Sequence, residues 1–119
     1  SKAASDKMSK PFKGLCLNEH LSWITALGND YAYEDIYARQ LLNFAQSGDL
    51  LMLLSVSGNS PNLVKAAQWA REHGVFVIAL TSSRPCQLAE LADFHIAVEE
   101  THYGRVEDGH MAICHMVCY

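Results

Sequence analysis

The sequence predicts an α/β fold of three layers, in which a parallel β-sheet lies between two layers of helices. Short apolar runs alternate along the chain with segments whose apolar residues recur at helical spacing. The run over residues 50–56 is apolar without alternation, which is typical of a strand covered on both faces, as in a parallel sheet. The connections between these segments are short, as in alternating strand and helix units.

The first expected strand covers residues 21–27 (LSWITAL), and the turn cluster Gly28-Asn29-Asp30 follows it. A helix is expected over residues 33–45, where Ile36, Tyr37, Leu41 and Phe44 recur at helical spacing. The sequence Ser47-Gly48-Asp49 then interrupts the chain before the second strand at residues 50–56.

The second helix is expected over residues 62–73, where Leu63, Ala67 and Ala70 repeat and Gly74 supplies a natural helix end. The remaining elements are a strand at residues 75–80, a short helix at 87–92, a strand at 94–98 and a helix at 105–119. The last helix is apolar on almost every side, which predicts that it is buried on more than one side and forms a subunit interface.

Composition limits the class of protein. The chain has 119 residues, half of them apolar and 18% charged, and its net charge is −4 with no run of basic residues. These values predict a single globular domain over residues 1–119 and argue against nucleic acid or an anionic membrane as partners. The apolar runs are shorter than a bilayer requires and the first residues do not form a signal peptide, so we expect a cytoplasmic protein.

Both ends of the chain are expected to continue into further sequence, because there is no initiator methionine and the last apolar segment runs to Tyr119 without a stop signal. The four cysteines have no CxxC spacing, and in a chain that builds its own core we expect reduced core thiols.

The most distinctive motif is SVSGNSP at residues 55–61, which follows the second strand. Ser60 and Pro61 occupy the positions of a helix N-cap and first helical residue, so the positive end of the helix faces the loop. Gly58 allows close approach of the backbone, and three serines add donors, which predicts a phosphate site. The alternative is that these residues only form a loop and cap a helix.

The type of phosphate ligand is narrowed by two missing motifs. The chain contains neither GxxxxGK[ST] nor GxGxxG, so neither a P-loop nor a dinucleotide fingerprint is present. Hydroxyls and backbone amides alone suit a small phosphorylated metabolite, and a sugar phosphate fits best.

Several segments together resemble the sugar isomerase (SIS) domain family, and in particular its phosphoheptose isomerase branch. These segments are ALGNDYAYEDIYARQL, SGDLLMLLSVSGNSPN, VFVIALTS and RVEDGHMAICH, so the resemblance covers essentially the whole chain. It implies a flavodoxin-like five-stranded parallel sheet flanked by helices, with its first strand upstream of Ser1, and a homotetramer with sites between subunits.

The resemblance also implies ligand-binding residues. Phosphate contacts in the family fall here on the serine loop, with Ser55, Ser57, Gly58, Asn59 and Ser60, and on Ser1. Asp30 occupies a position that contacts the sugar in phosphoheptose isomerases, although an Asp that closes a turn through its own backbone is an equal alternative.

Catalysis in the family is acid–base isomerisation between aldose and ketose through a cis-enediol, and its groups are only partly present. Glu107 and His115 match the family pair on the last helix, with His110 as a helical companion, whereas Lys7 and Pro11 stand where a His and a carboxylate are expected. His115 would serve as a base and Lys7 as a base or electrostatic stabiliser, although a buried structural histidine is the alternative for His115. Two remaining donors fall short of a zinc site, so we expect neither metal nor other cofactor.

Three functions therefore remain open: a phosphoheptose isomerase, an isomerase of another phosphosugar with a rearranged base, and a non-catalytic module that binds a phosphosugar. All three share a small sugar phosphate as ligand and a homo-oligomer formed through the last helix.

Overall fold

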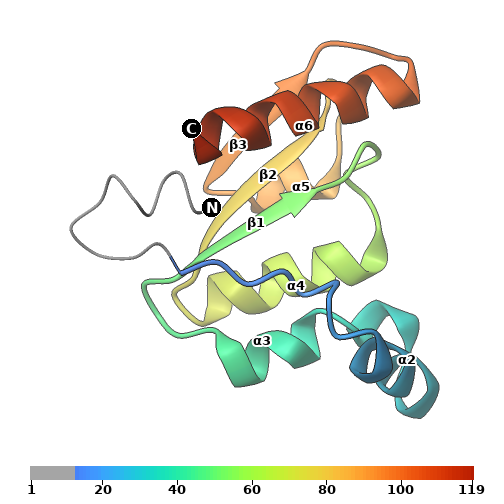
Figure 1. Ribbon diagram of the computed structural model, residues 1–119, viewed down its shortest axis with the longest axis vertical. Coiled ribbons are helices and arrows are strands. Elements are labelled where there is room, and N and C mark those ends of the chain that lie inside the picture. Colours follow the sequence, from blue (N-terminus) through green and yellow to red (C-terminus); the bar gives the residue numbers. More distant parts are fainter. Residues whose placement is uncertain (1–12) are drawn as a thin grey trace.

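The computed structural model describes residues 13–119, and within them three parallel strands form a sheet flanked by helices on both faces (Figure 1). In chain order the elements are α2 (Leu21–Asp30), the 3-10 helix η1 (Tyr33–Asp35), α3 (Ala38–Phe44), β1 (Leu50–Leu54), α4 (Pro61–Glu72), β2 (Phe76–Ser82), α5 (Gln87–Leu91), β3 (Phe94–Val98) and α6 (Tyr103–Cys118). The predicted three-layer α/β class with a parallel sheet is confirmed. Within residues 13–119, no helix has the length and apolar character needed to cross a membrane.

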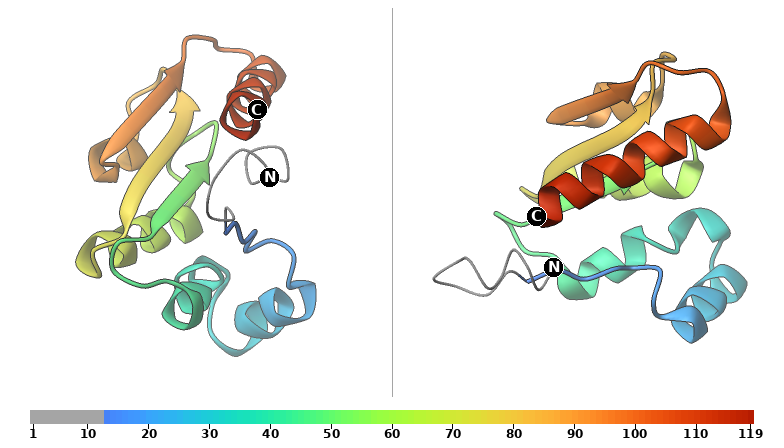
Figure 2. Two further views of the ribbon diagram at one scale, coloured as in Figure 1. Left: turned by 60° about the vertical axis from the view of Figure 1, so that its left-hand side comes forward. Right: turned by 45° about the horizontal axis from the view of Figure 1, so that its top comes forward.

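The strands lie in the order β1-β2-β3, with Leu51 paired to Val77 and Ala79 paired to His95. Helices α4 and α5 pack together on one face of this sheet, and α6 covers β2 and β3 on the other (Figure 2). Helices α2 and α3, with η1, lie beyond α4, on the side away from the sheet (Figure 1).

The core lies between the sheet and α4. Its buried side chains are small on the helix and branched on the strands, with Ala67 and Ala70 of α4 facing Leu51, Leu53 and Val77. Small helix residues let the helix approach the sheet closely, so the start of α4 is held at a defined place beside the end of β1.

The segment 21–27 was predicted to be a strand, and that prediction is wrong. These residues belong to helix α2, and Trp23, Ile24 and Leu27 are its more buried residues, at the i, i+1, i+4 spacing of one helix face. The Gly28-Asn29-Asp30 cluster is the last part of this helix rather than a turn after a strand. The sheet of the described residues therefore has three of the four expected strands.

Strand β1 was expected to be covered on both faces, and it is covered on one. Leu51 and Leu53 are buried, whereas Leu50 is 57% and Leu54 is 42% exposed. Alternate residues of a strand point to opposite faces, and within residues 13–119 α6 reaches β2 and β3 but does not cover β1. Two-face burial is found instead in the second half of β2, where Leu80 and Thr81 have no exposed surface.

Helix α6 also differs from its prediction of burial on several sides. Only Val106 and His110 are buried, and Met111, Met116 and Val117 are each more than half exposed. The helix begins beside Glu100, whose carboxylate accepts hydrogen bonds from the backbone N–H groups of His102 and Thr101 and from the Arg105 guanidinium. These bonds lower the pKa of Glu100 to about 2.

Candidate phosphate site

The loop of residues 55–60, between β1 and α4, is tied to the centre of the sheet. The Ser55 N–H donates to the carbonyl of Leu80 at 2.9 Å, and the Ser82 N–H donates to the carbonyl of Val56 at 3.2 Å. The loop therefore lies at the carboxyl end of β1 and β2, which is where open parallel sheets bind ligands.

Two serine hydroxyls organise the inside of this loop. The Ser55 Oγ accepts the N–H of Gly58 at 3.0 Å, and the Ser57 Oγ accepts the N–H of Asn59 at 3.3 Å. A hydroxyl has one hydrogen and two lone pairs, so accepting an amide leaves its hydrogen available for another acceptor. The two oxygens lie 3.5 Å apart, in a long hydrogen bond that either hydroxyl can donate. An anion that enters the loop would replace this weak contact and accept from both hydroxyls.

Gly58 is required by both its backbone and its surroundings. Its φ of +63° lies in the left-handed region, and the residue is buried. A Cβ built on it would overlap the Sγ of Cys86 and lie 2.7 Å from the Cys86 Cβ. The predicted close approach of the backbone is therefore an approach to Cys86 at the start of α5.

Asn59 links the loop to α5. Its side-chain Nδ2 donates to the carbonyl of Ser57 at 3.2 Å, and its Oδ1 accepts the N–H of Gln87 at 2.9 Å. The Leu88 N–H also donates to the carbonyl of Gly58 at 3.0 Å. The amide of Asn59, predicted to contact ligand, is thus engaged in holding the loop against the first turn of α5.

The third serine of the motif is the N-cap of α4, as predicted, with Pro61 as the first helical residue. The carbonyl of Ser60 accepts the N–H groups of Leu63 and Val64, but within residues 13–119 its hydroxyl makes no capping hydrogen bond. The hydroxyl of Ser60 is therefore available to a ligand at the positive end of the helix.

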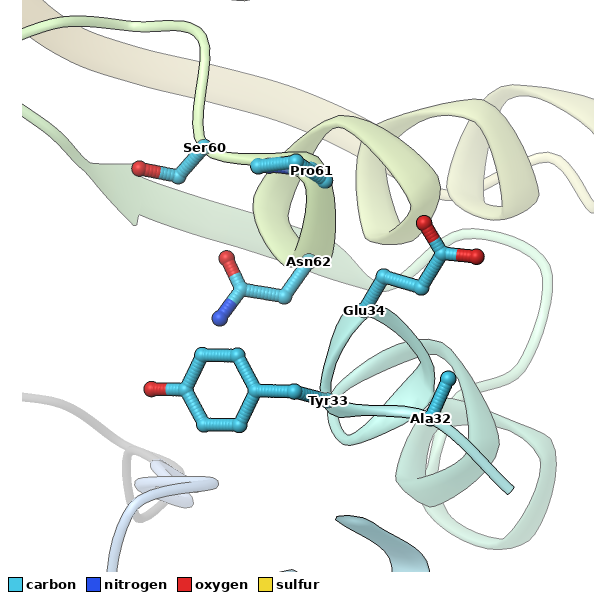
Figure 3. Close-up of a pocket in the computed structure, with 6 residues that line it drawn as sticks. All are labelled: Ala32, Tyr33, Glu34, Ser60, Pro61 and Asn62. Atoms are coloured by element: carbon cyan, nitrogen blue, oxygen red, sulfur yellow. The ribbon is translucent and has the colours of Figure 1, made fainter.

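A pocket of about 520 Å³ opens beside Ser60, between the start of α4 and η1. It is lined by Ala32, Tyr33, Glu34, Ser60, Pro61 and Asn62. Figure 3 shows the Ser60 hydroxyl, the Asn62 amide and the Tyr33 phenol directed to the same side of this pocket, whereas the Glu34 carboxylate points the other way. Three polar groups therefore converge on the side of the pocket nearest Ser60, and the Glu34 carboxylate is directed away from them.

An ion-pair cluster joins the two walls of the pocket. The Lys65 ammonium of α4 lies 2.7 Å from Glu34 Oε1 and 2.9 Å from Asp35 Oδ1 of η1. Hydrogen bonds to these two carboxylates raise the pKa of Lys65. The cluster explains the outward direction of Glu34 and holds η1 against α4.

A polar network lies under the serine loop and was not predicted. The Thr81 hydroxyl donates to the carbonyl of Ser82 at 2.8 Å and lies 2.7 Å from the Nε2 of His95. The Nε2 of His110 lies 3.2 Å from the Thr81 carbonyl. The network connects β3 and α6 to β2 directly behind Gly58, and no local sequence pattern identifies it because its members come from three elements.

The remaining predicted residues lie elsewhere. Ser1 and Lys7 fall outside the described residues. Asp30 ends α2 and accepts the amide of Asn29 at 3.2 Å, just before the segment that lines the pocket. Glu107 and His115 are exposed on α6, about 12 Å apart along the helix axis, and neither lines the pocket beside Ser60.

The cysteine prediction holds only in part. Cys86 is buried against the serine loop, as expected of a core thiol, whereas Cys16 is exposed.

The side chains of residues 13–119 do not by themselves make up the zinc site that the family resemblance allows. In residues 13–119 no group of three or more His, Cys, Asp or Glu side chains is placed to hold a metal ion. Glu107 and His115 alone are fewer than the three protein ligands of a catalytic zinc site.

Comparisons with known proteins agree with the fold. A family model described as SIS domain matches residues 9–82. The phosphoheptose isomerases of Rhodospirillum rubrum and Akkermansia muciniphila are 40% and 42% identical to this chain, and each match covers 94% of the chain and 60% of the relative. The chain thus spans about 60% of the length of these curated relatives.

Two solved structures are also similar. A phosphoheptose isomerase from Neisseria gonorrhoeae has a TM-score of 0.84 and 31% identity over 87% of this chain, which corresponds to 59% of that protein. One from Francisella tularensis has a TM-score of 0.87 and 28% identity over 92% of this chain and 59% of that protein. With its parallel sheet, its serine loop and a family match over residues 9–82, the chain belongs to the SIS domain family.

Proposed function

We propose that this chain binds a sugar phosphate and belongs to an aldose–ketose isomerase of the phosphoheptose type, with sedoheptulose 7-phosphate as substrate. The observation that carries the proposal is the serine loop. The Ser55 and Ser57 oxygens accept loop amides, and their hydroxyl hydrogens are engaged only in the long 3.5 Å contact between the two oxygens, which a bound phosphate would replace. Ser60 presents a further hydroxyl beside the pocket. The phosphoheptose isomerases at about 40% identity support the choice of substrate.

The phosphate would anchor the substrate, with the sugar extending into the pocket. Three serine hydroxyls and the positive end of α4 suit a cluster of phosphate oxygens. Ser1, which the family resemblance implies as a further phosphate contact, would complete this set.

Isomerisation needs one group that removes the proton next to the carbonyl and a second that moves a proton between the two oxygens, through a cis-enediol. We assign these roles to His115 and Glu107, with Lys7 stabilising the developing negative charge on oxygen. An imidazole titrates near neutral pH and can accept and return a proton without a large energetic penalty.

The exposed positions of Glu107 and His115 fit a site completed by another subunit. The apolar side chains of Met111, Met116 and Val117 are more than half exposed on the same helix. We propose that α6 forms a homo-oligomer interface, as in a homotetramer, and brings these two residues to a serine loop. A cytoplasmic location suits an enzyme of phosphorylated sugars.

A second candidate is a non-catalytic module that binds a phosphosugar and regulates or senses. One observation favours it: within residues 13–119, neither Glu107 nor His115 lines the pocket beside Ser60. The two candidates share the ligand and differ only in whether protons move.

Proton NMR in D₂O distinguishes them. The intact protein is mixed with sedoheptulose 7-phosphate, and deuterium uptake next to the carbonyl is followed together with ligand line broadening. The isomerase predicts uptake and a new aldose signal, both lost in His115→Ala and Glu107→Gln. Asp108→Asn changes the neighbouring exposed carboxylate on α6 and should leave uptake unchanged.

Line broadening without deuterium uptake would identify the binding module. The absence of both line broadening and deuterium uptake would contradict both candidates. The serine loop would then bind another phosphorylated ligand.

A further inference from the structure

Asn62, in the first turn of α4, has a side chain that the phosphate site as described does not use. The residue is only 8% exposed, yet it lines the pocket beside Ser60. Its Oδ1 accepts the N–H of Leu63 at 2.8 Å, which sets the orientation of the amide and leaves the Nδ2 donor on the other side.

The Nδ2 of Asn62 has no hydrogen-bond partner among residues 13–119. A donor that no protein group engages is free to bind an oxygen that enters the pocket. Among residues 13–119, the side-chain polar atoms that are inaccessible to solvent and lack a partner are Arg39 Nε and Gln40 Oε1. The Asn62 Nδ2 is not one of them, so it is accessible from the pocket that Asn62 lines.

The Nδ2 donor of Asn62 points into the pocket beside Ser60. Figure 3 shows the Asn62 amide pointing to the same side as the Ser60 hydroxyl, with the Tyr33 ring facing it from η1. The lining runs from Ser60 past Asn62 to residues 32–34, so Asn62 lies between the end of the serine loop and the far wall. A volume of about 520 Å³ is in the range of pockets for whole small molecules, not for a phosphate group alone.

We propose that Asn62 is a ligand-binding residue that donates a hydrogen bond from Nδ2 to a hydroxyl or carbonyl oxygen of the sugar carbon chain. The inference rests on the proposed function, because it takes the phosphate to be held by the serine hydroxyls. With the phosphate at Ser60, the atoms that reach Asn62 belong to the sugar. Asn62 therefore distinguishes a sugar phosphate from phosphate itself.

The test compares two ligands on two variants. The intact protein is titrated with sedoheptulose 7-phosphate and, separately, with inorganic phosphate, and dissociation constants are taken from shifts of protein amide signals. Asn62→Ala removes the donor, and Leu63 keeps its second acceptor, the Ser60 carbonyl. Loss of one neutral hydrogen bond predicts about a three- to tenfold weaker affinity for the sugar phosphate and an unchanged affinity for inorganic phosphate.

Two further variants serve as controls for this comparison. Asn62→Leu also removes the donor but keeps most of the side-chain volume, and it should show the same selective loss if Asn62→Ala folds poorly. Asn43→Ala removes an amide from the exposed side of α3, where Asn43 donates to the Arg39 carbonyl at 3.4 Å, and should change neither affinity.

The outcomes separate the inference from the proposed function. If the wild type binds the sugar phosphate and the Asn62 variants bind it equally well, Asn62 is not a ligand contact and the proposed function stands. If both ligands weaken equally, the amide contacts phosphate and the assignment to the sugar is wrong. If the wild type does not bind the sugar phosphate, the proposed function fails and the inference fails with it.

Discussion

Replacing Gly58 by alanine should destabilise the protein through two separable effects. The residue has a φ of +63°, and holding a non-glycine residue in that region costs about 1–3 kcal/mol. The new Cβ would also overlap Cys86 Sγ and lie 2.7 Å from Cys86 Cβ and 3.2 Å from Thr81 Cγ2, which is overpacking at a further cost of about 1–3 kcal/mol. The expected total is a loss of about 2–6 kcal/mol in the free energy of unfolding.

Gly48→Ala is the matched control for this change. Gly48 has a φ of +94°, and no atom lies within 4 Å of the position that a Cβ would occupy there, so this variant should show the backbone effect alone. Urea unfolding of both variants therefore isolates the overlap at Gly58. Combining Gly58→Ala with Cys86→Gly should recover about 1–3 kcal/mol relative to the sum of the single changes, because the overlapping atoms are gone.

Equal losses in Gly58→Ala and Gly48→Ala, with no coupling between Gly58 and Cys86, would refute the tight packing of the serine loop on the start of α5. The same loop geometry positions the serine hydroxyls, so the result also bears on ligand binding.

Three further changes test the surroundings of the site. The pKa of Glu100 is lowered from 4.5 to about 2 in the folded protein, so the stability that its carboxylate adds is present above pH 4.5 and lost as the pH falls toward 2. The unfolding free energies of wild type and Glu100→Gln should therefore differ at pH 6 and converge near pH 2. A difference that does not depend on pH would contradict this prediction. The pKa of Lys65 is raised above 10.5, so the stability that its ammonium adds is complete below pH 10.5 and is lost as the pH rises through the higher folded value. Lys65→Met should therefore lower the free energy of unfolding at pH 7 by an amount that decreases with added salt. A loss that does not depend on salt would point to packing instead. Thr81→Val should lower the free energy of unfolding by about 1–3 kcal/mol, because it leaves buried hydrogen-bond partners unsatisfied. A double-mutant cycle with His95→Ala should show coupling across the 2.7 Å contact between Thr81 and His95. Additive losses would mean that this contact contributes nothing.

The elements that were correctly predicted have strong local signals. Strand β1 was predicted from a continuous apolar run, and α4 from Ser60-Pro61 at its start and Gly74 after its end. Residues 21–27 failed because a short apolar run has no period of its own, and the following Gly28-Asn29-Asp30 resembled a turn. The spacing of Trp23, Ile24 and Leu27 was the available signal for a helix.

In the candidate site, too, the features with a local sequence signal were predicted and the others were not. The serine loop was predicted because its serines, glycine and proline are consecutive and follow a strand. The contacts that hold it were not, because Gly58 meets Cys86, and Asn59 meets Gln87, only after the chain has passed through α4 and β2. Asn62 has no sequence signature, since an asparagine in a first helical turn is common. What marks it is an Nδ2 donor at the pocket that has no hydrogen-bond partner among residues 13–119.

The central claim is that the serine loop holds the phosphate of a sugar phosphate, and the most direct measurement is the affinity of Ser57→Ala for sedoheptulose 7-phosphate. Ser57→Ala gives up the 3.3 Å hydrogen bond from the Asn59 N–H, but the Asn59 side chain keeps its bonds to the Ser57 carbonyl and the Gln87 N–H, so the loop should hold its position. Ser22→Ala on the exposed side of α2 is the control. Loss of one hydrogen bond to a charged phosphate oxygen predicts an affinity about 10- to 100-fold weaker in Ser57→Ala and unchanged in Ser22→Ala. An unchanged affinity in Ser57→Ala would contradict the account.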